Sequence, residues 1–160
     1  MKTIILLCAT LTTLTLLACD DNKAAILRGS EVFVPTAVID TQIFPQFLPF
    51  TPITTIACPL FPAFTTNFDL IFATSVRNNT FMDRVTLSLI DGTHVGSSIT
   101  FPRSKLDGMF GSTLIVSNRA FAFRPDFGCG VALPQSIRAD VVLVDGAGAT
   151  HSVTAGASFR

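Results

Sequence analysis

The chain has 160 residues, with 11 Lys and Arg against 11 Asp and Glu, and it contains 15 Phe but neither Trp nor Tyr. The balanced charge, without any basic cluster, argues against nucleic-acid binding. A charged fraction of 14% and a hydrophobic fraction of 49% exclude a disordered chain, because enough apolar surface is present to form a core.

The first 18 residues have the pattern of a secretion signal. Lys2 supplies a positive charge, and residues 3–18 are uncharged, being apolar or Thr. That stretch holds about 16 residues, whereas a helix needs roughly 20 apolar residues to cross the hydrocarbon core of a bilayer. Asp20 follows almost at once, so the stretch cannot be extended. We therefore predict a cleaved signal peptide over residues 1–18 rather than a permanent membrane span.

The end of this stretch, Leu16-Leu17-Ala18-Cys19, resembles the lipobox of bacterial lipoproteins. The resemblance implies cleavage before Cys19, attachment of diacylglycerol to Cys19, and a further acyl chain such as palmitate on the new amino terminus. Two or more acyl chains anchor a protein stably, whereas one chain holds it only marginally. The resemblance thus places the protein in the bacterial cell envelope, anchored to a membrane and exposed to the periplasm or the cell exterior. The alternative is an ordinary signal peptide with a chance cysteine at its boundary.

The four cysteines divide according to this prediction. Cys8 leaves with the signal peptide, Cys19 carries the lipid, and Cys58 and Cys129 remain in the mature chain. A secreted chain meets an oxidising compartment, so we predict a disulfide between Cys58 and Cys129. Two distant Cys and two His are too few for a metal site, and we predict no metal or other cofactor.

The rest of the chain is predicted to be a short tether followed by one β domain. Removing residues 1–18 leaves 142 residues, enough for a domain with its own core. Residues 19–30 are the lipidated cysteine and tether, and residues 31–160 are the domain. Apolar residues there alternate with the two-residue period of strands, and no segment has a convincing helical period. The predicted strands lie within residues 31–40, 68–76, 84–90, 97–102, 112–117, 120–125, 136–144 and 151–159.

Turns and an unusual proline-rich region separate these strands. Asp-Gly pairs at 91–92, 107–108 and 145–146 predict turns, and the last one joins the clearest hairpin. Residues 44–62 contain prolines at 45, 49, 52, 59 and 62, which predict either an extended edge segment or an irregular connection. Phenylalanines in this region either pack it onto the core or form an exposed apolar patch for a partner. These are Phe44, Phe47, Phe50, Phe61 and Phe64.

About seven or eight short strands separated by turns predict an all-β fold, an antiparallel β-sandwich. The pattern resembles an immunoglobulin-like domain over residues 31–160, without matching a specific family. Phe127-Gly128-Cys129 is similar to the Tyr-x-Cys segment of antibody-type domains, although Phe127 replaces the Tyr and no Trp is present to pack on the bridge. In the seven-strand order, Cys58 and Cys129 precede strands that run in the same direction. The bridge would then join two loops at one end of the sandwich rather than cross the core.

Few residues suggest catalysis. Ser152, His151 and Asp145 have the residue types of a nucleophilic triad, but neighbours in the sequence do not establish triad geometry, and no G-x-S-x-G motif is present. The aspartates of the three Asp-Gly pairs lack the spacing of a calcium loop. His94 follows a predicted turn, where polar residues are common. We predict no catalytic residues and no enzymatic activity.

These features predict a lipid-anchored envelope protein with a non-catalytic binding or structural role, acting through contact with another envelope protein. Loops at one end of the sandwich or an edge strand, by β-augmentation, would form the contact. The alternative is a lipoprotein that binds a glycan or a small ligand. The absence of Trp and Tyr weakens the glycan version, because their rings combine a stacking face with a polar group.

Overall fold

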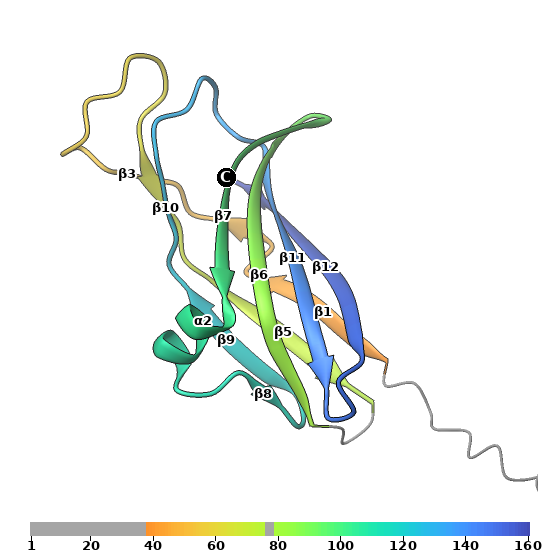
Figure 1. Cartoon of the computed structure of the whole chain (residues 1–160). Helices are drawn as coiled ribbons and strands as arrows, with labels where there is room; N and C mark the ends of the chain where they lie inside the picture. The colour runs from red at the N-terminus through yellow and green to blue at the C-terminus, as the bar shows by residue number, and fades with distance from the viewer. Residues whose placement is uncertain (1–37, 76–78) are drawn as a thin grey trace, which may run out of the picture. The chain divides into compact units, whose positions relative to one another are not determined.

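The computed structural model describes residues 38–75 and 79–160, and Figure 1 shows their arrangement. The fold is all-β apart from one short helix, α2 (Arg103–Phe110). Seven strands in these ranges have five or more residues: β1 (Ile39–Phe44), β5 (Phe68–Thr74), β6 (Thr80–Asp91), β7 (His94–Pro102), β9 (Arg119–Phe123), β11 (Ser136–Asp145) and β12 (Thr150–Phe159). The two-residue strands are β2 (Phe47–Leu48), β3 (Thr51–Pro52), β4 (Phe64–Thr65), β8 (Leu114–Ile115) and β10 (Asp126–Phe127).

The strands form three sheets. One has the order β1-β5-β9, a second has the order β10-β4-β3, and the largest has the order β2-β12-β11-β6-β7, with β8 also pairing with β6. All pairs are antiparallel except β12 with β2, which is parallel. The three-stranded sheet containing β5 lies behind the largest sheet in Figure 1. The prediction of an all-β, mainly antiparallel fold is therefore confirmed.

Alternating side chains build a single core between the sheets. Along β11, Ile137, Ala139, Val141 and Leu143 are buried, while the residues between them are more exposed. Successive side chains of a strand point to opposite faces, so each two-residue period places one apolar row inward. Aromatic rings then join the layers. The Phe101 ring of β7 meets the Phe123 ring of β9 edge-on at 5.5 Å, and the Phe64 ring of β4 meets the Phe159 ring of β12 at 5.5 Å.

The proline-rich region moves the chain from one sheet to the other. β1 pairs with β5 as far as Phe44, a cis peptide bond joins Phe44 to Pro45, and β2 then pairs with the end of β12. The side-chain amide of Gln46 donates a hydrogen bond to the carbonyl of Ile43 across this corner. Both interpretations of the region thus hold in part, because it contains a short edge pairing at β2 and an irregular connection after β3.

The helix α2 corrects two sequence predictions. No helix was predicted after residue 20, and Asp107-Gly108 was predicted to be a turn, yet both residues lie inside α2. The segment has only eight residues, and Leu106 is its one buried residue, so no helical period is visible in the sequence. Gly111, with φ of 69°, ends the helix in the left-handed conformation that glycine adopts readily.

Other boundaries also differ from the prediction. The stretch 112–117 was predicted to be a full strand, but only Leu114–Ile115 pairs, with the first residues of β6. The first described strand begins at Ile39, and the predicted strand residues 31–37 lie outside the described residues. The signal peptide, Cys19 and the tether also lie outside them. Within residues 38–75 and 79–160, no helix is long and apolar enough to cross a membrane.

Candidate functional site

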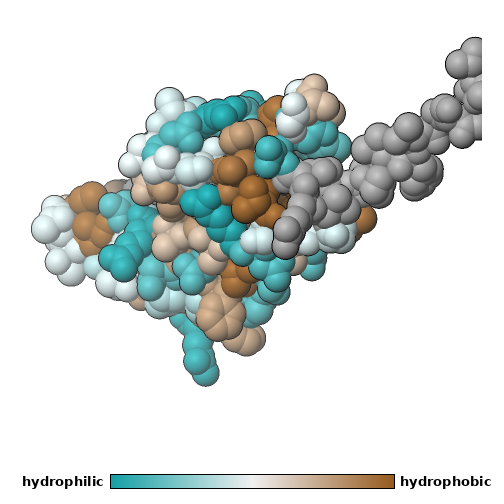
Figure 2. Space-filling model, turned by 90° about the horizontal axis from the view of Figure 1, so that it is seen from below, coloured by the Kyte–Doolittle hydropathy of each residue, from teal (hydrophilic) through white to brown (hydrophobic). Residues whose placement is uncertain are grey.

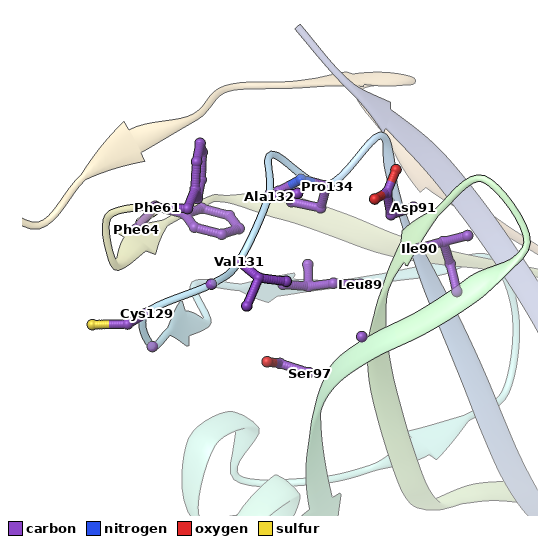
Figure 3. Close-up of a pocket in the computed structure, with 13 residues that line it drawn as sticks. Phe61, Phe64, Leu89, Ile90, Asp91, Ser97, Cys129, Val131, Ala132 and Pro134 are labelled. Atoms are coloured by element: carbon purple, nitrogen blue, oxygen red, sulfur yellow. The ribbon is translucent and has the colours of Figure 1, made fainter. Parts of the chain in front are cut away.

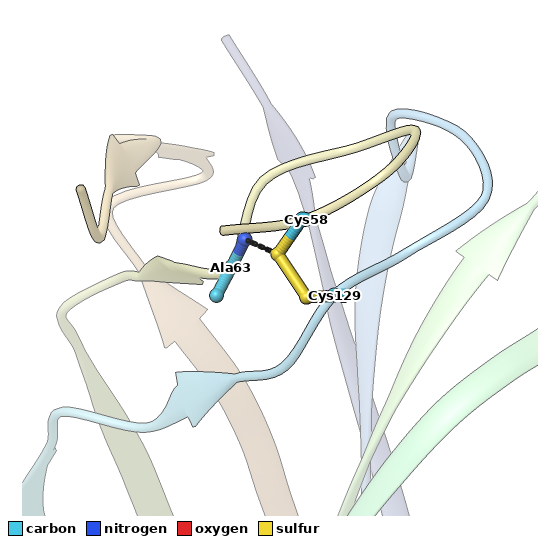
Figure 4. The surroundings of a disulfide bond; sticks show 3 residues. All are labelled: Cys58, Ala63 and Cys129. Atoms are coloured by element: carbon cyan, nitrogen blue, oxygen red, sulfur yellow. Dashed lines mark hydrogen bonds between the residues drawn. A yellow bond between two sulfur atoms is a disulfide. The ribbon is translucent and has the colours of Figure 1, made fainter. Parts of the chain in front are cut away.

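A disulfide joins two loops at one end of the domain (Figure 4). Cys58 and Cys129 have Cα atoms 5.4 Å apart, within the roughly 4.4–6.8 Å span of disulfides. Cys58 lies in the loop before β4 and β5, and Cys129 lies in the loop before β11. The main-chain N–H of Ala63 donates to Cys58 Sγ at 3.2 Å, as the dashed line in Figure 4 marks. The predicted pairing is confirmed, and so is its position between loops.

Main-chain hydrogen bonds hold the same two loops together. The Phe61 N–H donates to the Gly130 carbonyl at 3.2 Å, and the Gly130 N–H donates to the Phe61 carbonyl at 3.1 Å. A Cβ added at Gly130 would lie 3.3 Å from the carbonyl oxygen of Ala132, a tight contact. Glycine at this position therefore lets the loop pass close to its own next turn. The two loops form one unit rather than two independent segments.

A cavity of about 190 Å³ opens beside this unit (Figure 3). Figure 3 shows the loop that contains Val131 and Ala132 on one side of the cavity and the β7 strand that contains Ser97 on the other. Core residues form its inner wall. The lining residues are Phe61, Phe64, Leu89, Ile90, Asp91, Gly96, Ser97, Gly128, Cys129, Gly130, Val131, Ala132 and Pro134. Most of the wall is apolar, and Asp91 is the one ionisable side chain in it.

An irregularity in the strand pairing shapes the β7 wall. Ser88 pairs with Ser98 and Ile90 pairs with Val95, so Gly96 and Ser97 together face the single residue Leu89. Two residues opposite one are the mark of a β-bulge, which bends the strand and redirects its side chains. The bulge lies at the cavity and bends β7 there.

Apolar side chains stand exposed around the cavity on the two joined loops. Val131 is 85% exposed, Leu60 is 72% exposed and Leu133 is 55% exposed. Phe61 and Gly130 form an antiparallel β-bridge. Leu60 and Val131 are the next residues on either side of this β-bridge, so they lie opposite each other. We call Leu60, Val131 and Leu133 the disulfide-end surface. Seen from the opposite end, hydrophobic residues also show on the projecting β3–β4 loop, at the left of Figure 2.

The phenylalanines of residues 44–64 divide between the two predicted roles. Phe64 is buried, and Phe50 packs against it with ring centres 4.4 Å apart. Phe61 packs on Phe50 at 5.3 Å and lines the cavity. In contrast, Phe44 is 61% exposed and Phe47 is 64% exposed, at the corner where the chain changes sheets. The core interpretation holds for three of the five, and the exposed pair lies apart from the disulfide-end surface in the sequence.

Two of the three residues considered for a catalytic triad, Asp145 and His151, interact at the β11–β12 turn instead. Asp145 Oδ1 accepts hydrogen bonds from the N–H groups of Ala149 at 2.8 Å and Ala147 at 2.9 Å, and Oδ2 lies 3.4 Å from His151 Nε2. The hydrogen bond from Ala149 is the main cause that lowers the pKa of Asp145 below its ordinary value of 3.8. Ser152 follows His151 on β12, so its side chain points to the other face of the sheet. The three side chains therefore do not form a triad.

The aspartates of the Asp-Gly pairs do not converge. Asp91 lies at the end of β6, while Asp145 pairs with Thr80 at its beginning, so a whole strand separates them. Asp107 lies on α2, where its carboxylate accepts a hydrogen bond from Thr113 Oγ1 at 3.1 Å. In the part of the chain that the structure describes, no group of three or more His, Cys, Asp or Glu is placed to hold a metal ion.

The cavity and the disulfide-end surface were not identified from the sequence. The available signal is the run Gly130-Val131-Ala132-Leu133-Pro134, which places apolar residues in a loop bounded by Gly and Pro. Leu60 gives no such signal, because it stands within the apolar run Pro59-Leu60-Phe61-Pro62, in which no single residue is marked as exposed. Leu60 lies near Val131 only because the β-bridge between Phe61 and Gly130 joins two loops that are far apart in the sequence.

Comparison of the chain with protein-family models and with curated proteins gives no match. Among solved structures, the chain is similar to the one described as "X-ray structure of Northeast Structural Genomics Consortium target SoR45". The sequence identity is 9%, the TM-score is 0.46, and the alignment covers 76% of this chain and 86% of the other.

Proposed function

We propose that this chain is a protein-binding module of the bacterial cell envelope, anchored to a membrane through lipid on Cys19. The disulfide-end surface is its contact site. The observation that carries the proposal is the gathering of exposed apolar side chains on two loops that a disulfide joins, beside an apolar cavity. Exposed apolar groups that cluster in this way mark sites of association, whereas single exposed apolar residues need no explanation.

The rigidity of the loops supports a binding role. Association loses free energy when flexible loops must be ordered, so loops that are already held contribute more of their contact energy to affinity. The Cys58–Cys129 bond and the two hydrogen bonds between Phe61 and Gly130 order these loops before any partner arrives. Fully burying a side chain such as Val or Leu gains roughly 1.5–3 kcal/mol relative to leaving it exposed, so covering these three side chains favours association.

We also propose that the fold is an immunoglobulin-like sandwich. Taking the seven long strands in chain order as A to G, the sheets have the orders A-B-E and G-F-C-D. An immunoglobulin constant-type domain has ABED in one sheet and CFG in the other. The order here differs only in the fourth strand, β7, which pairs with β6 instead of β9. Variable-type domains likewise carry an extra strand next to C, which supports the assignment.

The position of the chain entry supports an outward-facing site. The carbonyl of Val38, the first described residue, accepts a hydrogen bond from the N–H of Ser75, which follows the last residue of β5. Cys58 precedes the first residue of β5, at the other end of that strand. The described part of the chain therefore begins at the end of the domain away from the disulfide-end surface, so attachment through Cys19 does not require that surface to face the membrane.

Site-specific photo-crosslinking in the bacterium that makes the protein tests the proposal. A photoreactive amino acid replaces Val131 in the full chain, and the matched control replaces Thr100, an exposed residue on the outer face of β7. We expect one recurrent protein adduct from position 131 that position 100 does not give, and its loss when Leu60 and Leu133 are both changed to Asp. Identical adducts from both positions, or none from position 131, would contradict the proposal.

A further inference from the structure

The cavity beside the disulfide-end surface has the size of a single side chain. Its volume is about 190 Å³. Pockets for drug-sized ligands have volumes of roughly 300–1,000 Å³. A cavity of about 150 Å³ lined by Leu, Ile and Phe, in contrast, binds benzene. The volume therefore matches one aromatic ring or one branched aliphatic group.

The surroundings of the cavity indicate how that group is presented. Val131 and Ala132 line its outer lip, and Leu133 follows them in the same loop. The main-chain N–H and C=O groups of these three residues have no hydrogen-bond partner among the described residues. A polypeptide can pair its own main chain with such groups, whereas a free hydrocarbon cannot. Val131 and Leu133 also extend the apolar contact beyond the cavity mouth. An anchor side chain in a pocket, surrounded by weaker contacts that exclude water, is the usual centre of a protein interface.

Addition of a long partner strand to β7 fits the structure less well. The bulge at Gly96 and Ser97 interrupts the regular ladder at the cavity. Bulges protect edge strands from pairing with other chains. At the other end of β7, the Lys105 ammonium of α2 lies 4.7 Å from the ring centre of Phe101. The regular free edge between these features is short, so the cavity and its lip are the stronger contact.

We infer that a partner polypeptide inserts one Phe, Leu or Ile side chain into the cavity lined by Leu89, Phe64 and Ser97, with its main chain against residues 131–133. This inference rests on the proposed function, because it assigns the partner chemistry of the same surface. The anchor side chain supplies most of the contact energy, and the lip positions the main chain on either side of it.

A peptide selection tests this anchor. The full chain is held in liposomes of phosphatidylethanolamine and phosphatidylglycerol, and a phage library of random 12-residue peptides is selected on them after depletion on empty liposomes. We expect the enriched peptides to share one Phe, Leu or Ile at a fixed position. Replacing that residue by Ala in a fluorescent synthetic peptide is expected to raise the Kd at least tenfold.

Variants that fill the cavity test whether the peptide binds there. Ser97→Phe fills it from β7, and Ala132→Leu fills it from the lip, so the test does not depend on one variant folding. Each is expected to weaken peptide binding at least tenfold, while Thr100→Phe, on the outer face of the same strand, leaves binding unchanged. Circular dichroism and thiol titration establish that each variant is folded with its disulfide formed.

Three outcomes overturn the inference. Enriched peptides that bind folded Ser97→Phe and Ala132→Leu as tightly as the parent would place the contact elsewhere. Benzene binding without any enriched peptide would assign the cavity to a small apolar compound. A dimer of the full chain that Ser97→Phe dissociates would make a second copy the occupant. Adducts from position 131 in cells are a separate readout, so the proposed function stands or fails independently of these results.

Discussion

The Asp145 carboxylate holds the β11–β12 turn in place through main-chain hydrogen bonds. Its Oδ1 atom accepts the N–H groups of Ala147 and Ala149, while the Gly148 N–H donates to the Asp145 carbonyl at 3.0 Å. Gly148 has φ of 88°, a conformation that a residue with a Cβ rarely adopts. The Asp145 side chain and Gly148 therefore hold the turn that the Asp145-Gly146 pair predicted.

Asp145→Ala is expected to lower the melting temperature at neutral pH, because the two N–H groups lose their acceptor. The lowered pKa of Asp145 means that the folded state favours the ionised carboxylate. Its stabilising effect is therefore fully present above the ordinary value of 3.8 and is lost as the pH falls through the lower folded-state pKa. The difference in melting temperature between parent and variant should shrink over that acidic range.

Thermal scans from neutral pH into this acidic range measure the effect. Asp91→Ala, in the other Asp-Gly hairpin, is the control, because its carboxylate accepts no hydrogen bond from any residue that the structure describes. A difference between Asp145→Ala and the parent that stays constant with pH would contradict the role of the ionised carboxylate.

At the level of elements, α2 covers part of the core beside β9 (Figure 1). Leu106 is fully buried, and the ring of Phe110 packs on those of Phe121 at 5.0 Å and Phe123 at 5.3 Å. The guanidinium of Arg103 lies over the Phe81 ring at 4.9 Å, which fixes the beginning of the helix on β6. Packing on the sheets, rather than intrinsic helix propensity, therefore maintains this short helix.

Leu106→Ala is expected to destabilise the domain by about 2–5 kcal/mol, because it removes buried methyl groups and leaves a cavity. Met109, on the same helix, is 42% exposed, and Met109→Ala is expected to cost within about 0.5 kcal/mol. Urea unfolding followed by circular dichroism gives both values. Equal losses for the two variants would mean that α2 does not dock on the core as described.

The disulfide acts between elements, since it joins the approaches to β5 and β11. The two cysteines are 71 residues apart, and in the chain-entropy model such a loop contributes about 4 kcal/mol of stability. Cys58→Ala combined with Cys129→Ala is expected to lower the urea midpoint, and reduction of the parent should have a similar effect. Unchanged midpoints in both cases would show that the bond does not stabilise the fold.

At the scale of the whole molecule, the lipid anchor is the central proposal. Cys19→Ser in the full chain is expected to move the protein from the membrane fraction to the soluble fraction, because acylation needs the thiol. Cys8→Ser is the matched control and should leave the protein in the membrane fraction, since Cys8 belongs to the proposed signal peptide. Fractionation after high-salt washing makes the comparison. Membrane retention of Cys19→Ser would contradict the anchor.

The strand content and the disulfide could be predicted because local patterns carry them. The alternation in β5, β6, β11 and β12 repeats every two residues, so a short stretch of sequence shows it. Once Cys8 and Cys19 are assigned to the proposed signal peptide and lipid anchor, Cys58 and Cys129 have only one possible pairing. The helix α2 could not be predicted, since eight residues with a single buried side chain produce no visible period. Residues 112–117 form only the two-residue strand β8, because the pairing with Thr80 and Phe81 of β6 extends no further, and a local pattern does not show where such a pairing ends.

The sequence by itself determined an all-β chain with a hydrophobic interior and one bond between two loops. Those features depend on the alternation of side chains along a strand and on residue type, and both can be recognised from short stretches of sequence. Only the tertiary structure decided that the Phe61–Gly130 bridge places Leu60 opposite Val131 and that Gly96 and Ser97 form a bulge. It also decided that a cavity of about 190 Å³ lies between that bulge and the loop that contains Val131. Each of these depends on the register between segments far apart in the chain, and register follows from the packing of the whole domain.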